Sequence, residues 1–191
     1  MKTFALTSLA LLCASALALA QDEPKTPTGK PTSAEESSRM PVGQLRVSGR
    51  VYVGEPAPDF ELTSSSGRQV SLSRLKGNWV LLHFADDRKA FAGLRELHEG
   101  LTQLGVVLLG ICKDKPQALR PFVQREGIPF ELVADVTGEI SAVYGLYDSA
   151  RSSSRPGFVV VDRNGIVRLA LQGQAPPKEV LELTRFTIVG F

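Results

Sequence analysis

The sequence predicts an α/β domain built on a central mixed β-sheet that is covered on both faces. Two continuous apolar runs, at 78–84 and 106–112, are typical of buried strands. The segment after the first run has apolar residues three to four positions apart, the period of a helix that packs on one face. Later, two strand-like runs at 158–162 and 166–172 are joined by Arg-Asn-Gly, which predicts an antiparallel hairpin. Parallel strands linked by helices and then a hairpin require a mixed sheet.

The first elements of the domain are short and extended. Residues 45–53 are typical of an edge strand or a strand pair. The runs 59–63 and 69–73 are separated by Ser-Ser-Ser-Gly-Arg, a turn by composition, so they predict an N-terminal β-hairpin. After the buried strand 78–84 we expect one helix of about 17 residues. Its apolar face would consist of Phe91, Leu94, Leu97, Leu101 and Leu104.

The second half of the domain continues the alternation. Residues 115–127 predict a helix that Gly127 can end. A short strand near 129–135 and a short helix through 138–145 come next. Prolines at the head of 176–186 suit the first turn of a last helix. This order of elements is that of a thioredoxin-like fold, with helices on both faces of the sheet.

The composition restricts the classes of function. The 191 residues carry a net charge of +2, too little for the basic surface that nucleic acid or an anionic membrane requires. Two cysteines exclude a disulfide scaffold and a Cys-rich zinc module. We therefore expect a fold that rests on an apolar core.

The start of the chain has the layout of a secretory signal peptide. Residues 1–20 contain one positive charge at Lys2, an apolar stretch, and small residues at Ala18 and Ala20. We expect an exported protein, periplasmic or secreted, with no membrane span after cleavage. Residues 21–44 are rich in Pro, Ser and Thr and lack an apolar period, which predicts a disordered linker before a domain at 45–191.

Three segments carry sequence patterns that occur together in one family. In 53–84, Gly-x-x-Ala-Pro-Asp-Phe leads into the hairpin, a Leu-x-Gly turn and a strand. Residues 133–146 contain Asp-x-x-Gly-x-x-x-Ala-x-Tyr-Gly, and 155–168 contain an Arg, a Phe, an Asp and a Gly in hairpin spacing. The chain thereby resembles the peroxiredoxins, the alkyl hydroperoxide reductase and thiol-specific antioxidant family of the redoxin group. This resemblance implies a thioredoxin fold and thiol-dependent peroxide reduction, without a cofactor.

The functional motif of that family does not match. Peroxiredoxins carry Pro-x-x-x-Thr-x-x-Cys between the strand and the long helix, where helix amides and the helix dipole stabilise the peroxidatic thiolate. Residues 84–99 contain no Pro, Thr or Cys. Asp86 and Asp87 stand there instead, and we expect them to cap the helix. A metal site is not expected, because His83 and His98 have no ligand spacing with these carboxylates.

Two residues remain as catalytic candidates. Arg155 keeps the position of a family site residue, but without a thiolate we expect it to pair with Asp86 or Asp87. Cys112 is the one thiol left after cleavage of the signal peptide, and two lysines that follow it can lower its pKa. A lone Cys at the end of an apolar strand is more often a small core residue.

Two hypotheses of function follow. The first is a peroxiredoxin-like domain whose peroxide reduction is lost, leaving a binding or structural module for a protein or small ligand. The alternative is a one-cysteine thiol oxidoreductase or peroxidase that uses Cys112 with an external thiol reductant. The apolar tail 186–191 favours either a homodimer or a last strand that packs back on the domain. The serines at 152–154 are expected to lie in a mobile loop.

Overall fold

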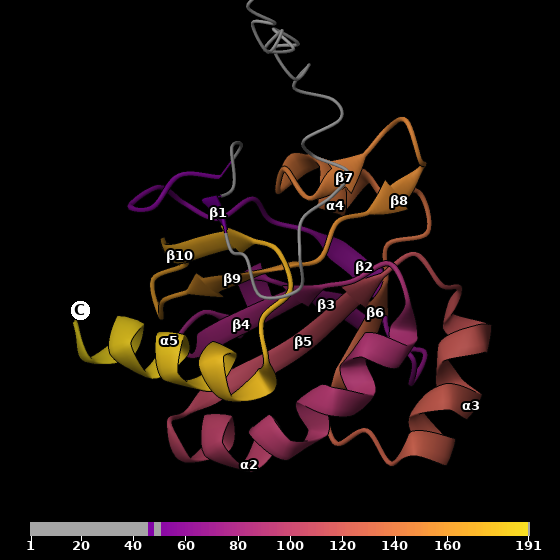
Figure 1. Ribbon diagram of the computed structural model, residues 1–191, viewed down its shortest axis with the longest axis horizontal. Coiled ribbons are helices and arrows are strands. Elements are labelled where there is room, and N and C mark those ends of the chain that lie inside the picture. The colour runs from indigo at the N-terminus through magenta and orange to yellow at the C-terminus, as the bar shows by residue number, and fades with distance from the viewer. Residues whose placement is uncertain (1–45, 48–50, 191) are drawn as a thin grey trace, which may run out of the picture.

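The computed structural model describes residues 46–47 and 51–190 (Figure 1). The predicted signal peptide, 1–20, and the predicted linker, 21–44, lie outside the described residues. Within the described ranges, no helix is both long enough and apolar enough to cross a membrane.

A six-stranded mixed sheet forms the centre of the molecule, in the order β1-β10-β9-β4-β5-β6. Strands β4, β5 and β6 are parallel, β9 runs antiparallel to β4, and β10 runs antiparallel to both β9 and β1. This arrangement confirms the predicted thioredoxin-like fold class. The strands are β1 (Arg46–Val47), β4 (Trp79–Phe84), β5 (Val106–Cys112), β6 (Glu131–Ala134), β9 (Gly157–Val161) and β10 (Val167–Gln172).

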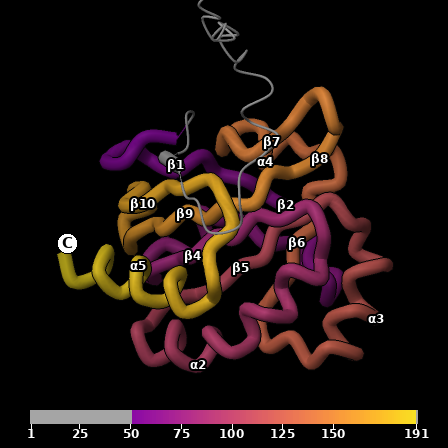
Figure 2. The backbone as a smooth tube through the Cα atoms, in the orientation of Figure 1, coloured from indigo at the N-terminus to yellow at the C-terminus, as the bar shows by residue number. Residues whose placement is uncertain are grey.

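Each face of the sheet packs on its own apolar cluster. On one face lie α2 (Arg95–Gln103), α3 (Pro116–Glu126) and α5 (Pro177–Val189), as Figures 1 and 2 show. The other face is covered by the hairpin β2–β3 and by α4. The elements on that side are β2 (Glu61–Thr63), β3 (Gln69–Ser71), the 3₁₀ turn η1 (Ser73–Leu75) and α4 (Glu139–Val143).

The predicted hairpin and the predicted end of α3 are both confirmed. Strands β2 and β3 pair antiparallel from Glu61 opposite Ser71 to Thr63 opposite Gln69. Gly127 ends α3 with a φ of 61°, and its amide donates to the Val123 carbonyl. Glycine suits this left-handed position because it has no Cβ.

The prediction of a single long helix after β4 is wrong in detail. The chain forms a 3₁₀ helix, η2 (Arg88–Leu94), and only then the α-helix α2. Phe91 and Leu94 are three positions apart, and a 3₁₀ helix places such residues on one side. Both are buried against the sheet. An α-helical stretch then brings Leu97 and Leu101, four positions apart, into the same cluster.

The predicted last strand is also wrong, because α5 continues through the apolar tail as far as Val189. Ile188 packs against the core from this helix. Phe186 and Val189 stand on the outer side, with 73% and 80% of their surface exposed. Phe191 lies outside the described residues.

The expected mobile loop is a short antiparallel ladder. Strand β7 (Tyr147–Asp148) pairs with β8 (Ser153–Ser154), and Ser154 is buried. Composition suggested a loop because the segment has no apolar period. Its order comes from hydrogen bonds to distant parts of the chain, described below.

Packing at the centre of β5 generates a test of the core. A Cβ on Gly110 would lie 2.5 Å from Leu132 Cδ2 and 2.9 Å from the Phe91 ring, closer than real contacts allow. We predict that Gly110→Ala lowers the free energy of unfolding by about 1–3 kcal/mol. Gly93→Ala is the matched control, since its Cβ would meet only Pro177 Cγ at 3.8 Å. Urea unfolding of both variants measures the difference, and equal stabilities would contradict this packing.

Candidate functional site

The segment where the family resemblance would place a reactive cysteine lies between the end of β4 and the start of η2. The chain leaves the sheet at Ala85, whose amide donates to the Ile111 carbonyl of β5 at 3.1 Å. Asp86 and Asp87 follow, and both are exposed. They therefore stand at the carboxyl end of the central strand, before the first turn of η2.

The two carboxylates hold different amides. Asp87 is the N-cap of η2, and its Oδ1 accepts a hydrogen bond from the Lys89 amide at 2.9 Å. Capping by this residue confirms the prediction. Asp86 instead accepts from the Ser154 amide on β8 at 3.0 Å. It therefore ties the end of β4 to a segment 68 residues further along the chain.

Ser154 connects this contact to a buried polar cluster. Its hydroxyl lies 3.0 Å from the Ser141 hydroxyl, which donates to Asp135 Oδ2 at 2.8 Å. Asp135 Oδ2 also accepts from the Ser141 amide at 2.8 Å. Asp135, Ser141 and Ser154 are all buried, and the large majority of buried polar groups in folded proteins are hydrogen-bonded. The cluster therefore holds β8 and α4 against the Asp86 position.

Arg155 does not pair with Asp86 or Asp87, so the expected ion pair is wrong. Among the described residues its partner is Asp148, with Nη2 3.4 Å from Oδ2. The β7–β8 ladder explains the choice, because it places Asp148 opposite Ser153, two residues before Arg155.

The pKa of Asp148 reflects its surroundings. Burial raises it, but hydrogen bonds from the Arg151 and Ala150 amides and the charge of Arg155 outweigh burial. The pKa of this carboxyl therefore lies below its ordinary value, and the ion pair with Arg155 is charged at neutral pH.

Two further cations near this end of the sheet, Arg88 and Lys113, also have protein partners. Arg88 Nη1 lies 2.8 Å from Asp114 Oδ1. Lys113 Nζ donates to the Ser152 carbonyl and lies 5.4 Å from the centre of the Tyr147 ring. These contacts join the ends of β5 and η2 to neighbouring segments, so both cations already have a protein partner.

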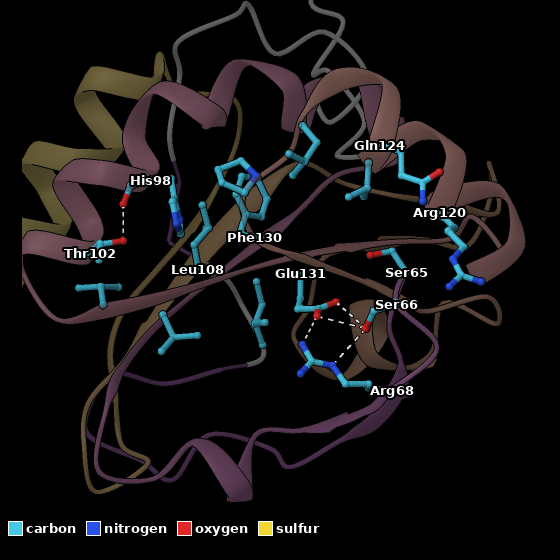
Figure 3. A pocket seen from close by; sticks show the side chains of 16 residues that line it. Ser65, Ser66, Arg68, His98, Thr102, Leu108, Arg120, Gln124, Phe130 and Glu131 are labelled. Atoms are coloured by element: carbon cyan, nitrogen blue, oxygen red, sulfur yellow. Dashed lines mark hydrogen bonds and ion pairs between the residues drawn. The ribbon is translucent and has the colours of Figure 1, made fainter.

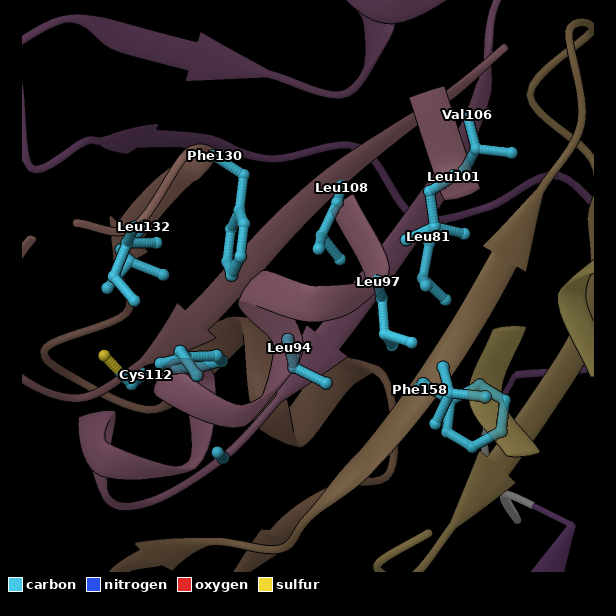
Figure 4. Packing of buried hydrophobic residues seen from close by; sticks show 14 of the residues in the cluster. Leu81, Leu94, Leu97, Leu101, Val106, Leu108, Cys112, Phe130, Leu132 and Phe158 are labelled. Atoms are coloured by element: carbon cyan, nitrogen blue, oxygen red, sulfur yellow. The ribbon is translucent and has the colours of Figure 1, made fainter. Parts of the chain in front are cut away.

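Cys112 is a core residue. Its side chain is fully buried in the cluster between the sheet and the helices (Figure 4). Burial raises the pKa of this thiol to about 12, and the nearby Asp114 amide lowers it only in part. At neutral pH the thiol is protonated, and only a thiolate attacks peroxide. The alternative that makes Cys112 a redox centre is not favoured.

His83 packs as a neutral ring. It lies on the helical face of β4, with its ring centre 5.8 Å from that of Phe91 in an edge-on arrangement. Burial lowers the pKa of His83 to about 4. Its Nδ1 is enclosed and has no hydrogen-bond partner in the described part of the chain, so nothing orients the ring for proton transfer. No cluster of three metal-ligating side chains occurs in residues 46–47 and 51–190.

Sequence reasoning missed a groove at the opposite end of the sheet. The groove has a volume of about 690 Å³, and His98 of α2 and Arg120 of α3 lie on its rim (Figure 3). Its floor includes Leu108 and Phe130. His98, a residue considered in the sequence analysis, lines this groove. A signal was present in Pro129, a residue that cannot donate a backbone hydrogen bond in a strand.

Comparisons with known proteins agree on one family. The family model described as "AhpC/TSA family" matches residues 53–170. Peroxiredoxin Q, chloroplastic, of Oryza sativa subsp. japonica is 29% identical over 178 residues, covering 88% of this chain and 82% of the relative. The putative peroxiredoxin bcp of Coxiella burnetii is 37% identical over 102 residues, covering 50% of this chain and 68% of the relative.

Solved structures are similar over the domain. Peroxidoxin BcpB of Mycobacterium tuberculosis matches with a TM-score of 0.66 at 18% identity, covering 74% of this chain and 98% of that chain. The reduced 2-Cys peroxiredoxin of Plasmodium vivax matches with a TM-score of 0.63 at 26% identity, covering 71% and 96%.

We predict that the Cys112 thiol is inert in the folded chain. A pKa of about 12 leaves much less thiolate at pH 8 than the ordinary thiol pKa of about 8.5. Residues 21–191, which contain one cysteine, should react with Ellman's reagent on the order of a thousandfold more slowly when native than in guanidinium. Native labelling at the denatured rate would contradict the burial of this side chain.

We predict that protonation of His83 lowers the stability of the fold in mild acid. Its folded-state pKa, about 4, lies below the ordinary value near 6.5, so the unfolded chain takes up the proton first. The stability that depends on neutral His83 is complete above pH 6.5 and is lost as the pH falls toward 4. In urea unfolding across this range, His83→Gln should show a shallower decline than the wild type. Parallel declines would show that His83 is not the group responsible.

Proposed function

The chain belongs to the AhpC/TSA family, and we propose that it is an exported member of this peroxiredoxin family in which peroxide reduction is lost and a binding module remains. The family assignment rests on the match over residues 53–170. The loss of the reaction and the export are proposals of our own, argued from this chain's residues.

One observation carries the loss of activity. Asp86 and Asp87 lead into η2, which begins at Arg88, and this segment contains no sulfur. In thiol-dependent peroxide reduction a thiolate attacks one peroxide oxygen, the O–O bond breaks, and a sulfenic acid and an alcohol or water result. A carboxylate cannot accept that oxygen atom and return it through a thiol reductant. The carboxylates at this position therefore cannot replace the thiolate.

The surroundings of Asp86 support the same proposal. Its carboxylate accepts a hydrogen bond from the Ser154 amide, and Arg155 forms an ion pair with Asp148. A peroxide anion or polarised peroxide would meet negative charge at Asp86 and Asp87 where the family's reaction needs positive potential. Binding of a neutral or cationic group is compatible with this position, and reduction of peroxide is not.

Export is supported by the sequence of residues 1–20, which has the layout of a cleaved signal peptide. A single buried thiol is also compatible with an oxidising compartment, because it offers no partner for a disulfide.

We propose that the binding partner is a protein, which can be a second copy of this chain. Support for a homodimer comes from α5, where Phe186 and Val189 present neighbouring apolar side chains to solvent. A thiol reductant would be a partner only if Cys112 were a redox centre, and its burial speaks against that role.

Peroxide consumption tests the proposal directly. Residues 21–191 are mixed with dithiothreitol and hydrogen peroxide or cumene hydroperoxide, beside Cys112→Ser and a family peroxidase as a positive control. We predict that the wild type and Cys112→Ser both consume peroxide at the rate of buffer, because neither has an accessible thiolate. Turnover that disappears in Cys112→Ser would establish Cys112 as a redox centre and overturn the proposal. Turnover that persists in Cys112→Ser would overturn it as well.

A further inference from the structure

Strand β5 begins before its neighbour β6. Val106 at the start of β5 already lies opposite Trp79 of β4, whereas pairing with β6 starts only at Leu109, opposite Glu131. Residues 106–108 therefore have a strand partner on one side only, within the described part of the chain. The sheet has a notch of three residues at this edge.

The backbone groups that face the notch follow from the register. On the β6 side, the Asp135 amide donates to the Cys112 carbonyl at 2.8 Å. On the β4 side, the Ala85 amide donates to the Ile111 carbonyl at 3.1 Å. Backbone groups of successive strand residues point to opposite sides, so the even-numbered residues of β5 face β6. Both backbone groups of Val106 and the N–H of Leu108 thus face the notch without a partner strand.

Proline explains why β6 does not extend into the notch. Continuing the register would place Pro129 opposite Val107, where an N–H should donate to the Val106 carbonyl. Proline has no N–H, so the ladder cannot continue there. The Ile128 amide donates instead to the Val123 carbonyl at 3.1 Å, which holds this segment toward α3. The notch is therefore a consequence of the sequence.

The groove of about 690 Å³ lies beside this open edge (Figure 3). Such a volume is within the range of sites that bind ligands. Val106, Leu108 and Phe130 supply an apolar floor, and Thr102 and Arg120 stand at the rim. The groove thus combines free backbone groups with space for a side chain.

The charge at the rim is positive. Arg68 is already bound to Glu131 and to the Ser66 hydroxyl. Arg120 is exposed and has no ion-pair partner among the described residues. An occupant with a carboxylate next to an apolar side chain would match both the floor and the rim.

We propose that this groove binds an extended, acidic peptide segment of a partner protein, which adds a short strand to β5 at Val106–Leu108. A peptide residue opposite Val107 donates its N–H to the Val106 carbonyl and accepts from the Leu108 N–H, the two hydrogen bonds that Pro129 leaves unmade. Side chains two positions apart share a face of the added strand, so on the helix-covered side an apolar one reaches Phe130 and an acidic one two positions away reaches Arg120. The site lies at the amino end of β5, away from Asp86 and Asp87, and the proposal does not depend on the loss of peroxide reduction.

Peptide selection and two matched pairs of variants test the proposal. A phage library of random octapeptides is selected against residues 21–191, and enriched peptides are synthesised for fluorescence anisotropy. We expect sequences that place an apolar and an acidic residue two positions apart. Thr102→Trp places a ring in the groove and should weaken binding at least about tenfold, the loss of one or two good contacts. Gln103→Trp, on the next exposed residue of α2 and outside the groove, should change affinity less than about twofold.

A second pair of variants tests the charge. Arg120→Glu should weaken the acidic peptides, whereas Arg185→Glu, an equal charge change on the exposed side of α5, should not. Circular dichroism and thermal melting establish that all four variants fold.

The backbone is tested through the peptide and through exchange. N-methylation of the central peptide residue removes its donor and should abolish measurable binding, while the same methylation at a terminal residue should not. Bound peptide should also slow hydrogen exchange of the Leu108 amide at least about tenfold. Failure to enrich any peptide, equal binding by Thr102→Trp and Gln103→Trp, or unchanged exchange at Leu108 would each overturn the proposal. None of these readouts involves peroxide, so they separate it from the proposed function.

Discussion

The molecule depends on strand β4, which is paired along both edges and covered on both faces. Its residues Val80 to Phe84 lie opposite β9 on one side and β5 on the other. Leu81 packs toward the three helices, while Leu82 and Phe84 pack toward the hairpin and α4. Every backbone group of such a strand is satisfied within the sheet, so the chain that leaves its carboxyl end has a nearly fixed position and direction. That end is where the family keeps its reactive sulfur.

The residues at this fixed position already engage the groups that a thiolate would need. A thiolate would need the free amides of the first helical turn and a nearby cation. In this chain Asp87 occupies an amide of η2, Asp86 occupies the amide of Ser154, and Arg155 is held by Asp148. A series of hydrogen bonds connects Asp86 through Ser154 to the buried Ser141. The carboxylates thus act as structural hydrogen-bond acceptors that order this end of the sheet.

Periodicity was enough to predict the sheet and its main helices, because the spacing of apolar residues along a short segment shows which of its faces is buried. The apolar runs of β4 and β5 and the left-handed Gly127 are signals of this kind. Contacts between short, polar segments carry no such signal. The ion pair of Arg155 depends on the β7–β8 ladder, and that ladder consists of four residues ordered by distant hydrogen bonds. The 3₁₀ geometry of η2 was hidden for another reason: Phe91 and Leu94 fit the period of either helix type.

A single register determines what happens at both ends of β5. Odd-numbered residues turn their backbone groups to β4, which brings the Ile111 carbonyl to Ala85 and starts the segment of Asp86 and Asp87. Even-numbered residues turn their backbone groups toward β6. The notch opens where Pro129, which has no N–H, cannot donate to the Val106 carbonyl. The two ends are about 20 Å apart at a strand rise of about 3.3 Å per residue. Sites at that separation with no shared side chains respond independently to substitution. A substitution at Asp86 or Asp87 therefore places no constraint on the open edge of β5 at the other end.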